Sequence, residues 1–484
     1  MFDNDEFTCE IDTLGYKQQA DAIRDLIIEC KTPYAIGISG RWGSGKTSLM
    51  KYIMASLNGK PLSHRLKFHD KTINDEEESR KFKSVIDLYP DKGQIKHIVP
   101  IWFNPWEYEN HDEPFVELLK EIHHFFNTTI LLNSTKKIAH TSIRAGLDIL
   151  ANFFNLGDNP ASHIQSLGEK YEQDHFAYTH RSQQFKLLFQ TAVEKLLTGA
   201  IGGKLDKNAR LVIFIDDLDR CEENVIGRLL KEIKQHLSTQ YCVFVFGYDR
   251  HHIEKALSQN NNRSLKESRA YLEKLFQSTI YIKQPDKTKL TTYINEQLNP
   301  ETGLYTFVNN RSNQTALTTF LLDILDPNPR RMKYFFTAFH LHVKANIRFQ
   351  NKSAIKLDDL QRLALMVYLK LFYEAIYSAL ENDPTVLSAI LAIFRTHKEA
   401  GINDFRECFV YLETKGHLST KDIVLEDAQK TSILQNGDSE KKFLTEVNEM
   451  QGKHKSFANF MQKFEECFKA FETENRYDDI HHYL

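Results

Sequence analysis

Gly40-Arg41-Trp42-Gly43-Ser44-Gly45-Lys46-Thr47 is the stretch that decides the fold, because it fits the phosphate-binding pattern G-x-x-x-x-G-K-[ST]. The apolar run at residues 34–39 precedes it and predicts a buried strand. Residues 48–57 follow it with apolar side chains at helical spacing. A strand, a glycine-rich loop and a helix in this order predict a site that binds the phosphates of a nucleoside triphosphate.

The chemistry expected of this loop rests on its glycines and on two side chains. Glycine lets successive backbone N–H groups point inward, and the positive end of the following helix adds to their attraction for phosphate oxygens. Lys46 is expected to reach the β- and γ-phosphates, and Thr47 to offer its hydroxyl to Mg²⁺. The predicted nucleotide-binding residues are Gly40, Arg41, Trp42, Gly43, Ser44, Gly45, Lys46, Thr47 and Ser48.

A cluster of carboxylates follows a second apolar run. Residues 211–215 predict a strand that is buried on both faces, as in a parallel sheet. Asp216, at the carboxyl end of this strand, is expected to hold Mg²⁺, which prefers oxygen ligands. Asp217 is the better candidate for orienting the attacking water and accepting its proton. Asp219 is expected to cap the helix that follows.

Two further apolar runs complete the predicted sheet. The run that starts at Cys242 predicts the next strand and ends in Asp249 and Arg250. Either of these two side chains can sense the γ-phosphate, or Asp249 can cap a following helix, and the sequence leaves both alternatives open. Residues 279–282 resemble a fourth strand, which Pro285 closes.

Four segments in this order resemble the KAP family of P-loop ATPases. They are the P-loop at residues 40–47, Trp102-Phe103-Asn104-Pro105-Trp106-Glu107-Tyr108, Asp216-Asp217-Leu218-Asp219-Arg220-Cys221 and Asn328-Pro329-Arg330-Arg331. The strand end Gly247-Tyr248-Asp249-Arg250 is similar to that of the family as well. A P-loop alone is not specific to one family, whereas its combination with residues 102–108 is, and the resemblance covers about the first 345 residues.

The resemblance implies an α/β fold of the P-loop NTPase type, a three-layer α/β/α core with a parallel sheet like that of AAA+ and STAND ATPases. A helical lid and an all-α C-terminal domain follow. In this core the second strand lies beside the strand that carries Asp216, which implies that Asn104 stands near Asp217 and orients it or the attacking water. The alternative is that Asn104 only satisfies the hydrogen bonds of a turn. Trp102 and Trp106 are expected to be core aromatics. The implied nucleotide is ATP.

The arginine element implies a sensor in the helical lid. An arginine at position 330 can pair bidentately with γ-phosphate oxygens and report hydrolysis to the lid. Arg331 is expected to face solvent or a carboxylate. The predicted catalytic residues are therefore Lys46, Asn104, Asp217 and Arg330, and the predicted metal ligands are Thr47 and Asp216.

The chain is expected to hold three parts. Residues 1–285 form the ATPase core with insertions at about 58–97 and 109–175, residues 286–345 the lid, and residues 346–484 a helical C-terminal domain. The insertion at residues 60–92 is polar and is expected to be exposed, and residues 176–198 predict a long helix.

Three local patterns add further expectations. Leu14 and Tyr16 are expected to pack on the sheet, with contact to the adenine as the alternative. Residues 363–380 predict one strongly apolar helix. A phenylalanine stripe at helical spacing predicts a core or an interface, and its members are Phe457, Phe460, Phe464, Phe468 and Phe471.

Composition narrows the setting. The net charge of -3 indicates no dedicated nucleic-acid or acidic-membrane surface. Six cysteines without C-x-x-C spacing indicate the reduced thiols of a cytoplasmic protein. Many family members carry membrane helices in the second insertion, but here the apolar stretch at residues 141–156 contains Arg144 and Asp148 and is shorter than the ~20 residues that a span requires.

The leading hypothesis is an Mg²⁺-dependent ATPase switch that acts as a homo-oligomer or through a separate effector protein, in regulation or antiviral defence by family analogy. One alternative is an assembly scaffold latched by its nucleotide, since Asp217 replaces the commoner glutamate and its shorter side chain makes slow hydrolysis plausible. The other alternative is an ATPase stimulated by nucleic acid, which the charge does not support.

Overall fold

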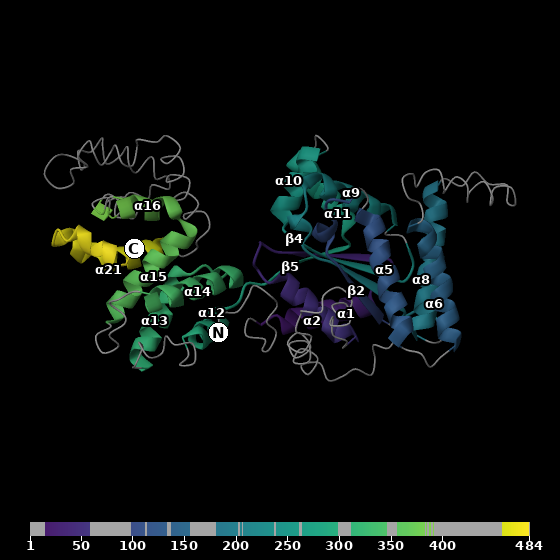
Figure 1. Cartoon of the computed structure of the whole chain (residues 1–484), viewed down its shortest axis with the longest axis horizontal. Coiled ribbons are helices and arrows are strands. Elements are labelled where there is room, and N and C mark those ends of the chain that lie inside the picture. The colour runs from purple at the N-terminus through teal and green to yellow at the C-terminus, as the bar shows by residue number, and fades with distance from the viewer. Residues whose placement is uncertain are drawn as a thin grey trace. The chain divides into compact units, whose positions relative to one another are not determined.

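A computed structural model describes residues 15–58, 98–111, 114–132, 137–154, 181–201, 204–205, 207–236, 239–260, 264–298, 311–345, 356–382, 384, 387–388, 391 and 457–483. The chain forms two compact units, Glu6–Lys283 and Gln284–Leu484 (Figure 1). The predicted exposed insertion at residues 60–92 and the side chain of Leu14 lie outside the described residues.

The N-terminal unit is built on a five-stranded parallel sheet. Its strands are β1 (Tyr34–Ser39), β2 (Ile98–Phe103), β3 (Arg210–Ile215), β4 (Cys242–Tyr248) and β5 (Ser278–Tyr281), in the order β2-β3-β4-β1-β5. The strands β2, β3 and β4 are buried along their whole length, which explains why their sequences are continuously apolar. The second strand lies beside the strand that ends at Asp216, so this implication of the resemblance is confirmed.

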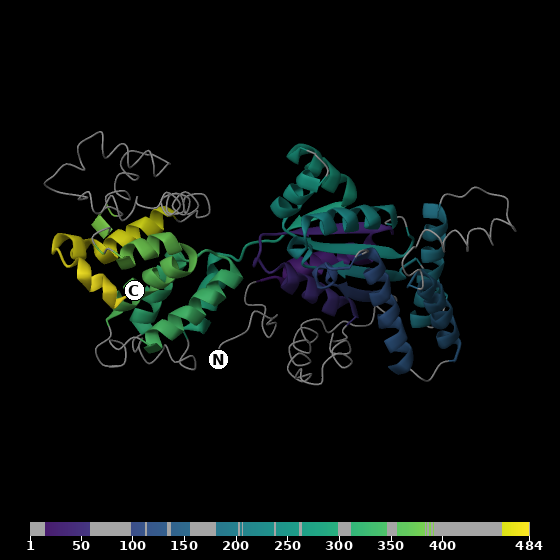
Figure 2. The ribbon, with the colours of Figure 1, turned by 45° about the horizontal axis from the view of Figure 1, so that its top comes forward.

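Helices cover both faces of the sheet, which confirms the predicted three-layer α/β/α fold (Figures 1 and 2). One face packs against α1 (Lys17–Glu29) and α2 (Lys46–Asn58). The other face packs against α5 (Pro114–Leu132), α9 (Glu223–His236), α10 (Arg250–Asn260) and α11 (Leu265–Leu275). Outside them, α6 (Lys137–Phe154) packs along α8 (Arg181–Ile201), the predicted long helix before the strand β3.

A buried arginine fastens α1 to the sheet. Arg210, the first residue of β3, donates from Nε to the carbonyl oxygen of Ile27 at 2.8 Å and from Nη2 to those of Ile28 and Cys30, both at 2.8 Å. The last carbonyl groups of a helix have no partner within the helix, and a cation there also stabilises the helix dipole. The guanidinium therefore fixes the C-terminal end of α1 to the start of β3. At the other end of the helix, the preceding residue Tyr16 contacts the P-loop.

The C-terminal unit is helical and shares one hydrophobic core. Its described elements are α12 (Lys287–Gln297), α13 (Arg311–Ile324), α14 (Pro329–Ala345), α15 (Leu357–Phe372), α16 (Glu374–Asn382), α21 (Phe457–Thr473) and η6 (Tyr477–His482). Four members of the phenylalanine stripe lie in this core, Phe460, Phe464, Phe468 and Phe471, so the expectation of core packing is confirmed for them.

The prediction of one helix over residues 363–380 is wrong. Tyr373 ends α15 with a backbone outside the helical region, at φ −146° and ψ 62°, and α16 starts at Glu374. Tyr373 is buried in the core, so tertiary packing interrupts a sequence whose apolar pattern continues. In the described part of the chain, no helix combines the length and the apolar character that crossing a membrane requires.

Candidate functional site

The P-loop connects the carboxyl end of β1 to α2, as the sequence predicted. Gly43 and Gly45 have φ values of 77° and 89°, a region that favours glycine because it has no Cβ atom. The N–H group of Ser44 donates to the carbonyl oxygen of Arg41 at 3.1 Å, and that of Gly40 donates to the carbonyl oxygen of Tyr248 at 3.1 Å. The glycines therefore allow the tight turn that a phosphate-binding loop needs.

Tyr16 supports this loop from the N-terminal end of α1. Its side chain is buried, and its hydroxyl donates to the carbonyl oxygen of Ser44 at 2.8 Å. A Cβ atom at Gly45 would collide with the same hydroxyl, so the glycine also permits this close approach. Tyr16 lies in the hydrophobic cluster that covers one face of the sheet, so the expectation that it packs on the sheet is confirmed. Its contact with the P-loop backbone is an additional role that no local pattern indicated.

Lys46 is the first residue of α2, and its ammonium group has three oxygen partners in this structure. The Nζ atom donates to the carbonyl oxygens of Gly40 at 3.0 Å and Arg41 at 3.4 Å. It also forms an ion pair with Oδ2 of Asp219 at 3.3 Å. The expectation that Asp219 caps the next helix is therefore wrong, because its carboxylate turns toward the P-loop while α9 begins only at Glu223.

Asp216 is a buried carboxylate at the carboxyl end of β3. Its pKa is raised to about 6, first because burial disfavours the charged form and second because the Asp217 carboxylate is close, while the nearby Thr47 hydroxyl and Lys46 ammonium oppose the shift. Neither carboxylate oxygen has a hydrogen-bond partner among the described residues. A buried anion of this kind fits a divalent cation, which would satisfy both the charge and the oxygens.

Two more buried oxygen atoms near the loop fit a ligand. The Ser44 hydroxyl and Oδ1 of Asp219 have no hydrogen-bond partner within the described part of the chain. Buried polar atoms in proteins are nearly always paired, and a pairless one calls for an explanation such as a bound ion. The Ser44 hydroxyl can donate to a phosphate group in the loop, whereas Oδ1 of Asp219 can only accept and fits a cation. Thr47 and Asp216 would hold Mg²⁺.

Asp217 adopts an uncommon backbone conformation, with φ 53° and ψ 30° in the left-handed region. Such strain in a residue other than glycine is frequent at functional sites. Its Oδ1 atom pairs with Nε of Arg220 at 3.1 Å, and the Arg220 guanidinium lies 5.5 Å from the ring centroid of Trp106. Trp106 is 38% exposed, so its prediction as a core aromatic is wrong, whereas Trp102 is buried as expected.

Asn104 lies directly after β2, beside the end of β3, where the N–H group of Asp216 donates to the Phe103 carbonyl oxygen at 3.1 Å. Its Oδ1 atom accepts from Nε1 of Trp102 at 2.8 Å, and its Nδ2 donates to Oε1 of Glu107 at 2.6 Å. These bonds hold the amide within its own segment. A role for Asn104 in orienting Asp217 or the water stays a prediction.

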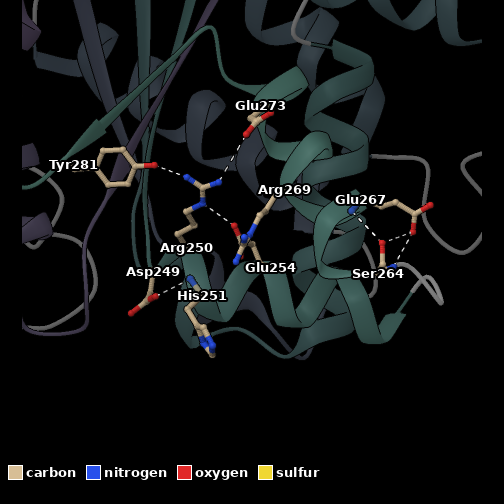
Figure 3. A network of polar contacts seen from close by, with 9 residues as sticks. All are labelled: Asp249, Arg250, His251, Glu254, Ser264, Glu267, Arg269, Glu273 and Tyr281. Carbon is tan, nitrogen blue, oxygen red and sulfur yellow. Dashed lines mark hydrogen bonds and ion pairs between the residues drawn. The ribbon is translucent and has the colours of Figure 1, made fainter. Parts of the chain in front are cut away.

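Asp249 and Arg250, the two residues whose role the sequence left open, both serve α10 (Figure 3). Oδ1 of Asp249 accepts from the His251 N–H group at 3.0 Å at the start of this helix. Arg250 donates from Nε to Glu254 at 2.6 Å and from Nη1 to the Tyr281 hydroxyl. Asp249 therefore caps α10, one of its two predicted roles. Arg250, the first residue of this helix, pairs with Glu254 within α10 and with Tyr281 of β5.

The arginine element lies in the C-terminal unit, at the first turn of α14. Asn328 accepts the N–H group of Arg331 at 3.2 Å, so it caps the helix. Arg331 pairs with Asp326 at 3.1 Å and lies 4.1 Å from the ring centroid of Phe372, so it faces a carboxylate, one of its two predicted environments. Arg330 is half-buried, and its role as a phosphate sensor stays a prediction.

The described cysteines are free and buried, and Cys9 and Cys408 lie outside the described residues. Among the residues that the structure describes, no group of His, Cys, Asp and Glu side chains has the arrangement of a closed metal site. The candidate cation position at Asp216 therefore depends on a nucleotide to supply further oxygen ligands.

Comparisons with known proteins show which family the chain resembles. The KAP family P-loop domain matches residues 16–346. Among solved structures, the Aeropyrum pernix ORC2 protein in its ADPNP-ADP complexes is similar at 11% sequence identity and a TM-score of 0.34, with 98% of each chain covered. No curated protein matches the chain.

Proposed function

The chain belongs to the KAP family of P-loop NTPases, and from this premise we propose that it is an Mg²⁺-dependent ATPase that works as a molecular switch. The observation that carries the proposal is the buried Asp216 carboxylate, whose two oxygens lack partners among the described residues, close to Thr47 and Lys46. A carboxylate this costly to bury is typical of a cation site.

Different residues bind the phosphates, hold the metal ion and activate the water in the proposed reaction. Lys46 and the P-loop amides bind the β- and γ-phosphates, and Thr47 and Asp216 hold Mg²⁺, which supplies positive charge for the phosphates when bound. Asp217 orients the attacking water and accepts its proton. Its strained backbone supports a fixed carboxylate position.

The end of the N-terminal unit supports the switch. The side chain of Gln19 donates to the Tyr281 carbonyl oxygen at 2.7 Å and accepts the Lys283 N–H group at 3.2 Å. The Ile282 N–H group donates to the Ser39 carbonyl oxygen, one residue before the P-loop, at 2.9 Å. The last residues of the N-terminal unit, which ends at Lys283, are thus hydrogen-bonded next to the P-loop, where a nucleotide-dependent change can act on them.

The remaining parts of the proposal rest on the family analogy. Arg330 would sense the γ-phosphate and close the helical lid on the core. The switch would act in regulation or antiviral defence, as a homo-oligomer or through a separate effector protein. Sizing the purified protein with and without ATP and Mg²⁺ tests the oligomer, and a size that never changes would count against it.

The site assignment is tested by ATP binding and turnover in matched variants. Lys46→Ala should abolish ATP binding in calorimetry, and Asp217→Ala should keep binding and lose turnover. Lys51→Ala, in the same helix α2, is the control for a lost lysine and should behave as the wild type. Normal binding by Lys46→Ala, or normal turnover by Asp217→Ala, would remove the assignment.

A second function is favoured by the contact between Asp217 and Arg220. A carboxylate that is tied to a guanidinium is a weaker proton acceptor, so the nucleotide can serve as a structural latch with little hydrolysis. Excess ATP over wild-type protein separates the two functions. Many turnovers per chain support the switch, and fewer than one supports the latch. Arg220→Ala should speed turnover if the arginine restrains Asp217.

A further inference from the structure

Asp219 lies outside every role that the P-loop pattern assigns, yet it contacts the P-loop lysine. The two residues are 173 positions apart in the sequence, and their side chains are 9% and 7% exposed for Asp219 and Lys46. In so dry an environment an ion pair is held strongly, and removing either partner leaves a costly charge. Breaking the contact between Lys46 and Asp219 therefore changes the free energy of the site.

This contact competes with a phosphate for the same ammonium group. A Lys side chain has three N–H donors, and the Lys46 donors face Gly40, Arg41 and Asp219. A β- or γ-phosphate oxygen that contacts Lys46 must take over at least one of these positions. Of the three oxygen atoms that Lys46 contacts, only that of Asp219 carries negative charge, as a phosphate oxygen does. A phosphate oxygen is therefore expected to replace Asp219.

The local charge makes the competition depend on a metal ion. Asp216, Asp217 and Asp219 place three carboxyl groups within four positions, and Arg220 pairs with Asp217. Lys46 is the cation that contacts Asp219. A triphosphate without a divalent cation would bring further negative charge to these carboxylates, whereas Mg²⁺ would offset it.

We propose that Asp219 is a specificity-determining residue that competes with nucleotide phosphates for Lys46, so that the P-loop selects nucleotide bound to a divalent cation over free nucleotide. This inference rests on the proposed function and deepens it. The free oxygen Oδ1 of Asp219, which has no partner among the described residues, adds to the repulsion of a metal-free phosphate. The preference for nucleotide bound to a divalent cation then comes from a residue of this chain, in addition to the charge of the nucleotide itself.

The test is calorimetric titration of wild type, Asp219→Asn and Asp249→Asn with ATP, in Mg²⁺ and in EDTA. Asparagine keeps the size of the side chain and removes the charge. Asp219→Asn should bind tighter in both conditions, by about tenfold in EDTA, the factor that about 1.4 kcal/mol represents, and by less in Mg²⁺. The ratio of the two dissociation constants should therefore fall toward one.

The control Asp249→Asn removes a carboxylate from the end of the neighbouring strand β4, where it caps α10 without contacting Lys46. It should leave the ratio at the wild-type value. Metal-free pyrophosphate serves as a second probe, because it isolates the phosphate contacts from those of the adenosine. If Asp219→Asn does not fold, Asp219→Ser carries the same test.

Weaker binding by Asp219→Asn would overturn the proposal, because Asp219 would then position Lys46 for the nucleotide. An unchanged ratio would overturn it as well. If Lys46→Ala abolishes binding while Asp219→Asn has no effect, this inference fails and the proposed function stands. If wild type binds no ATP in either condition, both fail.

Discussion

Replacing Asp216 with asparagine should stabilise the N-terminal unit at high pH. The pKa of Asp216 is raised from 3.8 to about 6, and each pKa unit corresponds to about 1.4 kcal/mol. The favourable contribution of the protonated form is fully present below 3.8 and is lost as the pH rises through about 6. At pH 8 the ionised carboxylate therefore costs the folded state about 3 kcal/mol.

The pH dependence separates this effect from any direct effect of the amide. Roughly half of this cost is already present at pH 5, because the unfolded carboxyl group has ionised there. The difference in unfolding free energy between Asp216→Asn and wild type should therefore grow by about 1–2 kcal/mol from pH 5 to pH 8. Titrating groups that do not interact with Asp216 behave alike in both proteins and cancel in this difference, whereas Asp217 and Lys46 are coupled to it.

Urea unfolding followed by tryptophan fluorescence is the suitable assay. All three tryptophans of the chain, Trp42, Trp102 and Trp106, lie in the N-terminal unit, so the signal reports on the unit that contains Asp216. Circular dichroism also records the helices of the C-terminal unit, so the free energy is extracted from the fluorescence transition, provided that this transition has a single step. A difference that is equal at both pH values, or a wild type that gains relative stability at pH 8, would refute the reasoning.

Three further substitutions test the surroundings of the P-loop. Gly45→Ala should lower the unfolding free energy by about 1–3 kcal/mol and abolish ATP binding, because the φ of 89° and the Tyr16 hydroxyl exclude a Cβ atom. A normal urea midpoint would contradict this loop geometry. Tyr16→Phe removes the hydrogen bond to Ser44 and should weaken ATP binding about fivefold by calorimetry, near 1 kcal/mol, and an unchanged affinity would show that the bond does not shape the loop. Arg210→Met leaves the last carbonyl groups of α1 without their donor and should destabilise the N-terminal unit by about 2–4 kcal/mol in urea; a loss below about 0.5 kcal/mol would show that water replaces the guanidinium.

The sheet and the P-loop could be predicted because their signals are local. An apolar run, a glycine-rich loop and a helical period each extend over about ten neighbouring residues, and they predicted the strands β1, β3 and β4 correctly, with Asp216 at the carboxyl end of β3. The place of β2 beside β3 came from the resemblance of residues 102–108, since nothing in the strand itself states its neighbour.

The contacts that were not predicted join segments that are distant in the sequence. The position of Asp219, three residues after Asp216, is equally compatible with a helix cap and with an ion pair, and only the folded sheet brings it to Lys46. Trp106 is exposed because it lies in a short 3-10 turn after β2, where a hydrophobic side chain need not face the core. Tyr373 interrupts an apolar pattern for reasons of packing that no periodicity records.

The most direct measurement is an experimental structure of the protein with Mg²⁺ and a non-hydrolysable ATP analogue. The account predicts that phosphate oxygens lie within hydrogen-bond distance of Lys46 Nζ, that the metal ion lies between the Thr47 hydroxyl and the Asp216 carboxylate, and that Asp219 has released Lys46. Phosphates bound away from the loop at residues 40–47, or a metal ion without Asp216 near it, would contradict the account.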